Sequence, residues 1–199
     1  ANETSKFWLG MLNDLKNRGL KDVLFFCVDG LAGFKEAISA VYPQAQIQRC
    51  VIHMLRNSFK YVNYSDLKKF SNDFKAVYNA PNETAAYSEL EMLKEKWGRK
   101  YPYAIRNWEN NWEDVSSFFQ FSEEIRKIMY TTNILEGLNR QYRKVTKTKS
   151  VFPSDQSLEK MLYLASENIT KKWTQRYRGW DQVLNQLIVL YGERLTEYL

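Results

Sequence analysis

The chain of 199 residues contains one histidine, His53, and only two cysteines, Cys27 and Cys50. A single histidine excludes metal sites built from several histidines, and two cysteines cannot supply the disulfide framework of a small secreted domain. Cys50 and His53 have the spacing of half a zinc motif, but a closed structural zinc site needs four ligands. We therefore expect no structural zinc, and a reducing, cytoplasmic location.

Glycine and proline are also scarce, with 8 and 4 residues, which favours long helices over a turn-rich β protein. No segment approaches about 20 consecutive apolar residues, so we expect no membrane span. The first residues lack the basic stretch and apolar run of a secretory signal. The sequence holds no P-loop, no G-x-G-x-x-G and no G-x-S-x-G, which are the usual signals of soluble-nucleotide chemistry and of serine hydrolases.

Positive charge is concentrated in one segment, residues 126–149. This segment carries seven of the 29 basic residues and a single acid, Glu136, so its net charge of +6 equals that of the whole protein. A concentrated basic patch attracts a polyanion, because each neutralised phosphate releases condensed counterions. The nucleic-acid-binding candidates here are Arg140, Arg143, Lys144, Lys147 and Lys149.

A helix through this segment would separate its polar and apolar side chains. At about 100° per residue, Arg140, Arg143 and Lys147 fall within about 40° of Glu136, and Lys144 within about 80°. The apolar side chains, Ile134, Leu135, Leu138, Tyr142 and Val145, lie on the opposite side. One interpretation is a solvated face with a weak Glu-to-Arg pair; the other is a metal-binding carboxylate on a helix whose basic flank holds nucleic acid.

The first fifty residues alternate between helical and strand patterns. Apolar spacing predicts a helix over about 5–18 with a stop at Gly19, and a second helix over 31–42. The continuous apolar run 23–28 predicts a strand buried on both faces, and 46–52 a second strand. This order is typical of an α/β sheet built from crossover connections.

From His53 to about residue 127 the strand signal disappears. Helices are predicted over about 53–62, 66–79 and 83–98, with Asn82 as an N-cap and Pro102 in the first turn of another. Trp108 and Trp112, four residues apart, are expected to share a helix face and to pack in the core.

The last part of the chain is predicted to hold two more helices. One is capped by Ser154 or Ser157 and runs to about 170, and the other spans about 181–198. Between them, residues 171–178 interleave cations with aromatic rings, a composition suited to phosphate contact and base stacking. A solvated connection between helices is equally compatible with it. The additional nucleic-acid candidates are Lys171, Lys172 and Arg176.

Two carboxylates are candidates for chemistry. Asp29 directly follows the predicted buried strand, at the edge where open α/β sheets bind ligands, although an Asp before Gly30 also suits a plain turn. Glu136 lies on the basic helix. Carboxylates brought together from two such elements bind Mg²⁺ or Mn²⁺, and two such ions can activate a water or a 3′-hydroxyl in phosphoryl transfer.

Three ordered motifs carry a resemblance: VDGLAGFKEAI (28–38), RCVIHMLRN (49–57) and YTTNILEGLNRQYRKVTKTK (130–149), the last followed by FPSD. Together they resemble the Mutator-like family of bacterial insertion-sequence transposases, from about residue 3 to the end. The resemblance implies an RNase H-like catalytic core with a DDE triad, interrupted by a helical insertion. The expected fold is therefore mostly helical α/β, with a partial core of about two strands (1–55), an all-helical insertion (56–128) and the C-terminal helices (129–199).

By the same resemblance Asp29 is the second Asp of the triad and Glu136 its Glu. Cys50 and His53 form the family's Cys-x-x-His motif. The role of His53 stays open between a hydrogen-bonded junction residue and a group that orients a carboxylate or touches the scissile phosphate. The first Asp of the triad has no counterpart in residues 1–28, so we expect a fragment that is inactive alone.

The function expected is two-metal phosphoryl transfer on double-stranded DNA, at transposon ends and target, by a homodimer. The alternatives are a non-catalytic basic DNA-binding module, and a helical domain whose Trp and Tyr side chains bind protein. Substitution of Glu136 separates the first two, and salt dependence of DNA binding separates the last two.

Overall fold

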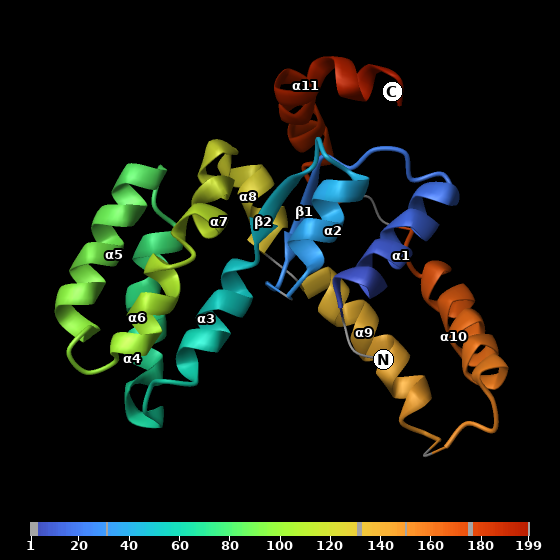
Figure 1. Cartoon of the computed structure of the whole chain (residues 1–199), viewed down its shortest axis with the longest axis horizontal. Helices are drawn as coiled ribbons and strands as arrows, with labels where there is room; N and C mark the ends of the chain where they lie inside the picture. Colours follow the sequence, from blue (N-terminus) through green and yellow to red (C-terminus); the bar gives the residue numbers. More distant parts are fainter. Residues whose placement is uncertain (1–3, 31, 131–132, 150, 175–176, 199) are drawn as a thin grey trace. The chain divides into compact units, whose positions relative to one another are not determined.

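The computed structural model describes residues 4–30, 32–130, 133–149, 151–174 and 177–198 (Figure 1). These residues are mostly helical, with one two-stranded parallel sheet, so the helical content and the number of strands agree with the expectation. The chain divides into two compact units, Ala1–Tyr130 (unit 1) and Thr131–Leu199 (unit 2). No helix of the described residues is both long enough and apolar enough to cross a membrane.

Unit 1 begins with the sheet and the two helices that cover it. Helix α1 (Ser5–Asn17) is followed by β1 (Phe25–Val28), α2 (Phe34–Val41) and β2 (Gln46–Arg49). The strands pair in parallel with Phe25 opposite Gln46 and Val28 opposite Arg49. Helix α2 supplies the crossover that a parallel pair requires, so the βαβ order predicted from the sequence is confirmed.

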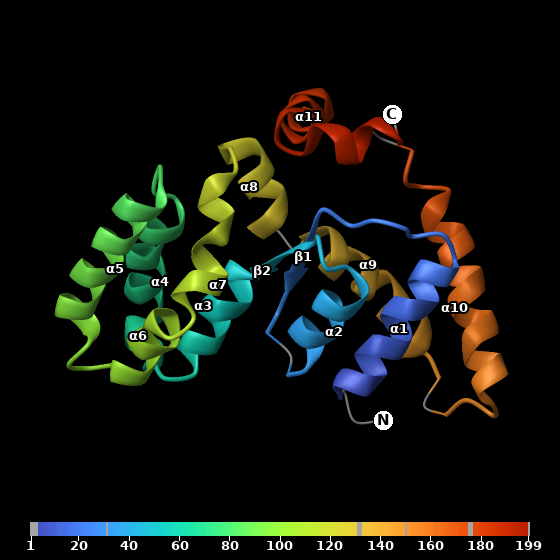
Figure 2. The ribbon, with the colours of Figure 1, turned by 45° about the horizontal axis from the view of Figure 1, so that its top comes forward.

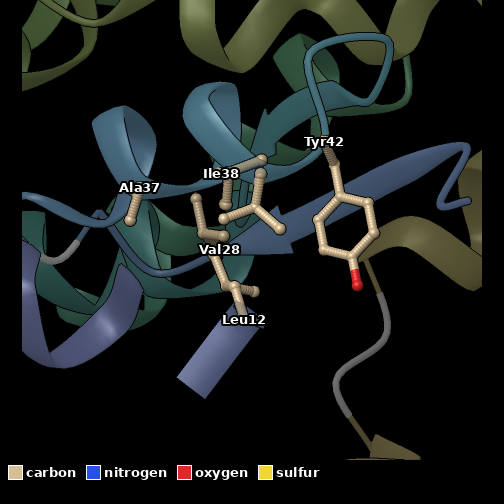
Figure 3. Close-up of a cluster of buried hydrophobic side chains, with 6 residues drawn as sticks. Leu12, Val28, Ala37, Ile38 and Tyr42 are labelled. Atoms are coloured by element: carbon tan, nitrogen blue, oxygen red, sulfur yellow. The ribbon is translucent and has the colours of Figure 1, made fainter. Parts of the chain in front are cut away.

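The core of this region lies between the helices and one face of the sheet (Figure 3). Leu12 of α1, Val28 of β1 and Ile38 of α2 are buried against one another. The Trp8 and Phe34 rings stack at 4.4 Å, and the Tyr42 hydroxyl donates to the Leu20 carbonyl at 2.8 Å. The amphipathic spacing seen in the sequence therefore places the apolar stripes of both helices on the same strands.

The opposite face of the sheet differs from the prediction. Val28 is the one buried residue of β1, and Cys27, expected in the core, is exposed. On this face Gln48 is buried: its Nε2 donates to the Val115 carbonyl, and its Oε1 accepts from Ser117. The prediction of a strand buried on both faces was wrong, because among the described residues the contacts of this face are mostly hydrogen bonds. The one ring contact there joins Phe25 to Phe121, with 5.7 Å between ring centroids.

The rest of unit 1 is helical, and the sequence missed part of it. The predicted helices appear as α3 (Val51–Phe59), α4 (Tyr64–Tyr78), α5 (Glu83–Trp97) and α6 (Pro102–Glu109). Helices α4 and α6 pack beside α3, and α5 packs on α4 and α6 (Figures 1 and 2). Asn82 caps α5 by accepting from the Ala85 N–H at 2.9 Å, as predicted. The elements that were not predicted are α7 (Trp112–Ser116), a 3₁₀ helix (Ser117–Gln120) and α8 (Glu123–Tyr130).

A buried hydroxyl ties α3 to α6. Ser58 accepts from the indole N–H of Trp108 at 3.0 Å and lies 3.2 Å from the carbonyls of Met54 and Ala104. Trp108 is fully buried, which confirms its core role. Trp112 does not share its face, because α6 ends at Glu109 and Trp112 begins α7, where its N–H donates to Glu83.

Unit 2 contains α9 (Asn133–Thr146), α10 (Asp155–Thr170) and α11 (Trp180–Thr196). Ser154 and Ser157 form a reciprocal capping box at the start of α10, as the sequence suggested. Helices α9 and α10 pack together, and the Tyr142 and Ser166 hydroxyls lie 2.8 Å apart between them. Helix α11 bends at Gly192, whose φ and ψ of 11° and −90° are not helical.

Replacing Ser58 by Ala should destabilise the chain by about 1–3 kcal/mol, because the buried Trp108 N–H would lose its acceptor. Ser65→Ala, at an exposed position of α4, is the matched control and should stay within about 0.5 kcal/mol. Urea unfolding of the 199-residue chain measures both. Equal stability of the two variants would contradict the role given to the hydroxyl.

Candidate functional site

Asp29 lies where the sequence placed it, directly after β1 and exposed. The N–H of Cys50 donates to the Val28 carbonyl at 2.7 Å, so the chain leaves both strands side by side. Asp29, Cys50 and the first turn of α3 therefore share the carboxyl edge of the sheet. This is the edge at which parallel sheets bind ligands.

Gly30 turns the chain immediately after Asp29. Its φ of +87° lies in the left-handed region that favours glycine. A Cβ at this position would approach the Arg49 guanidinium to 2.6–2.8 Å, so Arg49 lies directly against the turn. Arg49 also donates through Nη1 to Asn111, and its buried Nε has no hydrogen-bond partner among the described residues.

Arg49 is a site residue that sequence reasoning missed. The sequence could have indicated Arg49, because it ends the second of two parallel strands. It must therefore lie at the same edge of the sheet as Asp29, which follows the first strand. Arg49 lines a cavity of about 150 Å³. Lys35 and Asp114 line the same cavity and form an ion pair, with 2.7 Å between Nζ and Oδ1. The Asp29 edge is thus polar and carries charges of both signs.

Cys50 and His53 occupy the N-terminus of α3. Burial, with a smaller effect of the Asp29 charge, raises the pKa of the Cys50 thiol, although the N–H groups of His53 and Ile52 oppose this rise. His53 is half-buried, and its Nδ1 is buried with no hydrogen-bond partner among the described residues.

The second candidate acid, Glu136, lies in the first turn of α9. Arg140, Arg143, Lys144, Lys147 and Lys149 are all exposed. Tyr142, on the predicted apolar side, packs toward α10 as expected. Leu135, predicted on the same side, is 60% exposed. The helix therefore presents a basic surface, with one acid near its positive end, where a carboxylate is favourable.

The last group of predicted nucleic-acid residues follows α10. Lys171 and Lys172 are exposed at its C-terminus, where positive charge complements the helix dipole. Arg176 lies outside the described residues. Trp173, between these cations, is 57% exposed.

The structure divides the predicted metal ligands between the two units. Asp29 belongs to unit 1 and Glu136 to unit 2, so their meeting remains a prediction. His53, the third predicted catalytic residue, also belongs to unit 1. Within the part of the chain that the structure describes, no group of three His, Cys, Asp or Glu side chains is placed to hold a metal ion. The donor chemistry nevertheless fits a hard cation, because Asp29 offers exposed carboxylate oxygens while the neighbouring thiol is buried.

Comparison with known proteins identifies the class. Residues 1–176 match the family model described as "Transposase, Mutator family", and the chain belongs to this family. It is 42% identical over 193 residues to the transposase for insertion sequence element ISRM3 of Rhizobium meliloti (strain 1021), covering 96% of this chain and 48% of that protein.

Two further relatives give the same picture. A probable insertion-sequence transposase of Corynebacterium diphtheriae is 36% identical over an alignment of 218 residues, covering all of this chain and 64% of that protein. The transposase for insertion sequence element IS905 of Lactococcus lactis subsp. lactis (strain IL1403) is 34% identical over 191 residues. The alignment covers 96% of this chain and 49% of that protein. The chain thus spans about half the length of most of the curated relatives that it matches.

Gly30→Ala should destabilise the chain by about 1–2 kcal/mol, because a Cβ is strained at positive φ and would displace the Arg49 guanidinium. Gly10→Ala is the matched control: Gly10 lies inside α1, and a Cβ there meets nothing within 4 Å. This control should instead stabilise the chain by about 0.5–1 kcal/mol. Urea unfolding that showed the same sign for both substitutions would contradict the strained turn.

Proposed function

We propose that this chain forms part of the catalytic region of a DDE-type transposase, which cleaves and transfers transposon-end DNA by metal-assisted phosphoryl transfer. Family membership supports the DNA transposition role. The observation that carries the chemistry is the exposed carboxylate of Asp29 at the carboxyl edge of a parallel sheet. An RNase H-like core remains the fold that the resemblance implies.

In this proposal Asp29 and Glu136 hold Mg²⁺ or Mn²⁺ together with a further Asp from the complete transposase. When bound, two such ions activate a water or a 3′-hydroxyl and stabilise the leaving oxygen. The 199 residues alone supply two of the three acids, so we expect no strand cleavage from them.

The remaining roles belong to cations and to His53. The exposed Arg140, Arg143 and Lys147 hold the phosphates of duplex DNA and fix its register without reading its sequence. His53, whose buried Nδ1 has no hydrogen-bond partner among the described residues, would orient a neighbouring carboxylate or contact the scissile phosphate. Arg49, held against Gly30, supplies fixed positive charge next to Asp29. The protein would act as a homodimer on paired ends.

The alternative is a non-catalytic module whose basic helix only docks on phosphates. The exposure of Arg140, Arg143 and Lys144 on α9, and of Lys147 and Lys149 directly after it, favours docking as much as it favours the enzyme. The two functions differ in what they require of the acids, since docking gains from the loss of a negative charge and metal-dependent chemistry does not.

Asp29→Asn and Glu136→Gln, made in the complete transposase, should each reduce end cleavage by about 10²-fold or more, because several kcal/mol of charge stabilisation depend on the metal. DNA affinity should hold or rise. Cleavage of labelled transposon-end DNA measures the activity of each variant, and a parallel binding titration measures its DNA affinity. Asp14→Asn, at an exposed position of α1, is the control, and this variant should cleave DNA normally.

Undiminished cleavage by both site variants, or its loss only in proportion to DNA affinity, would refute the catalytic assignment. Stronger binding by Glu136→Gln in a protein that never cleaves would instead support the docking module.

His53→Leu should leave the unfolding free energy of the 199-residue chain within about 0.5 kcal/mol, because no hydrogen bond of Nδ1 is lost. The same change should lower end cleavage by the complete transposase by about 10²-fold, the scale of a positioned polar group. His53→Gln, which restores a polar group, should recover part of the activity. Parallel loss of stability and cleavage would favour a structural role.

A further inference from the structure

Unit 2 contains an open groove along the hairpin of α9 and α10, of about 670 Å³. All of its lining residues belong to this unit. From α9 and the turn after it come Gln141, Lys144, Val145, Thr148 and Lys149, spaced so that they follow one helix face. We call this surface the α9–α10 groove.

The rim of the groove is positively charged. Lys144 and Lys149 lie on the α9 side, and Lys160 and Lys172 on the α10 side, with no acid among the lining residues. All four lysines are exposed, and none is in an ion pair with another described residue. Four uncompensated cations on two sides of a groove are complementary to a phosphate backbone.

The floor of the groove is apolar, formed by Val145, Met161, Ala165 and Ile169. Leu164 is 52% and Trp173 57% exposed within it, which is a large apolar exposure for a charged surface. The backbone N–H of Trp173 donates to the Thr170 carbonyl at 3.0 Å, which fixes the backbone from which the indole projects at one end of the groove. An occupant must therefore offer both negative charge and apolar faces.

We propose that the α9–α10 groove binds unpaired DNA, with phosphates on the four lysines and bases on Trp173 and the apolar floor. The inference rests on the proposed transposition function and adds the state of the DNA that this surface takes. Duplex DNA presents phosphates but stacks its bases inside, so it would leave the apolar floor uncovered. Bases of an unpaired strand stack on aromatic side chains irrespective of sequence.

The volume of the groove lies within the range of about 300–1,000 Å³ typical of pockets for a small organic molecule, so it has room for individual bases. Its lining does not include the exposed Arg140 and Arg143 of α9, or Lys147 in the turn after this helix. The two surfaces can therefore be tested separately.

The test measures binding of fluorescein-labelled DNA of about 12 nucleotides, as a single strand and as a duplex, to the 199-residue chain. Trp173→Ala should weaken single-strand binding by about 10-fold, within the range known for loss of one base stack, and change duplex binding by less than about 2-fold. Tyr163→Ala removes an equally exposed aromatic of α10 that does not line the groove, and should change neither affinity.

A lysine pair extends the test to charge. Lys144→Gln, inside the groove, should lower the single-strand salt slope by about 0.7, the value for one phosphate contact. Lys147→Gln, in the turn directly after α9 and outside the groove, should leave this slope unchanged and weaken duplex binding instead.

Equal losses on single-strand and duplex DNA in Trp173→Ala would overturn the proposal, as would a change in oligomeric state of Trp173→Ala without any change in DNA affinity. Circular dichroism of each variant excludes misfolding as the cause. Failure here leaves the cleavage results for Asp29 and Glu136 untouched. Normal cleavage by those two variants would refute the catalytic assignment while single-strand binding in the groove could persist.

Discussion

The parallel pairing of β1 with β2 is the constraint on which the chemistry of unit 1 depends. Because the strands run in the same direction, the residues that follow them emerge at one edge, which brings Asp29 beside Cys50 and the start of α3. The pairing is held from one side by the core of α1 and α2 and from the other by hydrogen bonds to Gln48. Gly30 and Arg49 then shape the turn in which the carboxylate lies exposed.

Helix α9 shows how one basic segment can serve several purposes. One side packs on α10 through Tyr142, a second presents Arg140 and Arg143 to solvent, and a third contributes Lys144 to the groove. Lys147 follows in the turn after the helix and is also exposed. Glu136 lies in the first turn, upstream of these cations. A single amphipathic pattern in the sequence thus contains two separate cationic surfaces. The proposed ligand of one is duplex DNA, and that of the other is unpaired DNA.

Much of the fold was predictable because its signals are local. The strand–helix–strand order followed from the apolar run before Asp29 and from helical spacing after Gly33, and the starts of α5 and α10 followed from Asn82 and Ser154. Exposure of Cys27 was not predictable, because it depends on what covers the sheet. Helix α7 was missed because its five residues carry too few turns to show a period. Helix α8 was missed because its last residues were assigned to the basic segment 126–149.

The candidate site was predictable only as positions along the chain. Asp29 could be placed at a sheet edge from its neighbours, whereas the contact of Arg49 with Gly30 needed the register of the two strands. The groove required knowledge that α10 packs against α9, because its lysines are up to 28 residues apart in sequence. The meeting of Asp29 with Glu136 depends on how two units assemble, for which no local pattern exists.

The most direct test of this account is a crystal structure of the complete transposase with Mn²⁺, located by its anomalous scattering. We predict that the Asp29 and Glu136 carboxylates lie within about 4–6 Å of each other, and that both contact the manganese, at the edge beside Arg49. Manganese bound without either carboxylate, or the two acids on opposite sides of the assembled protein, would contradict the account.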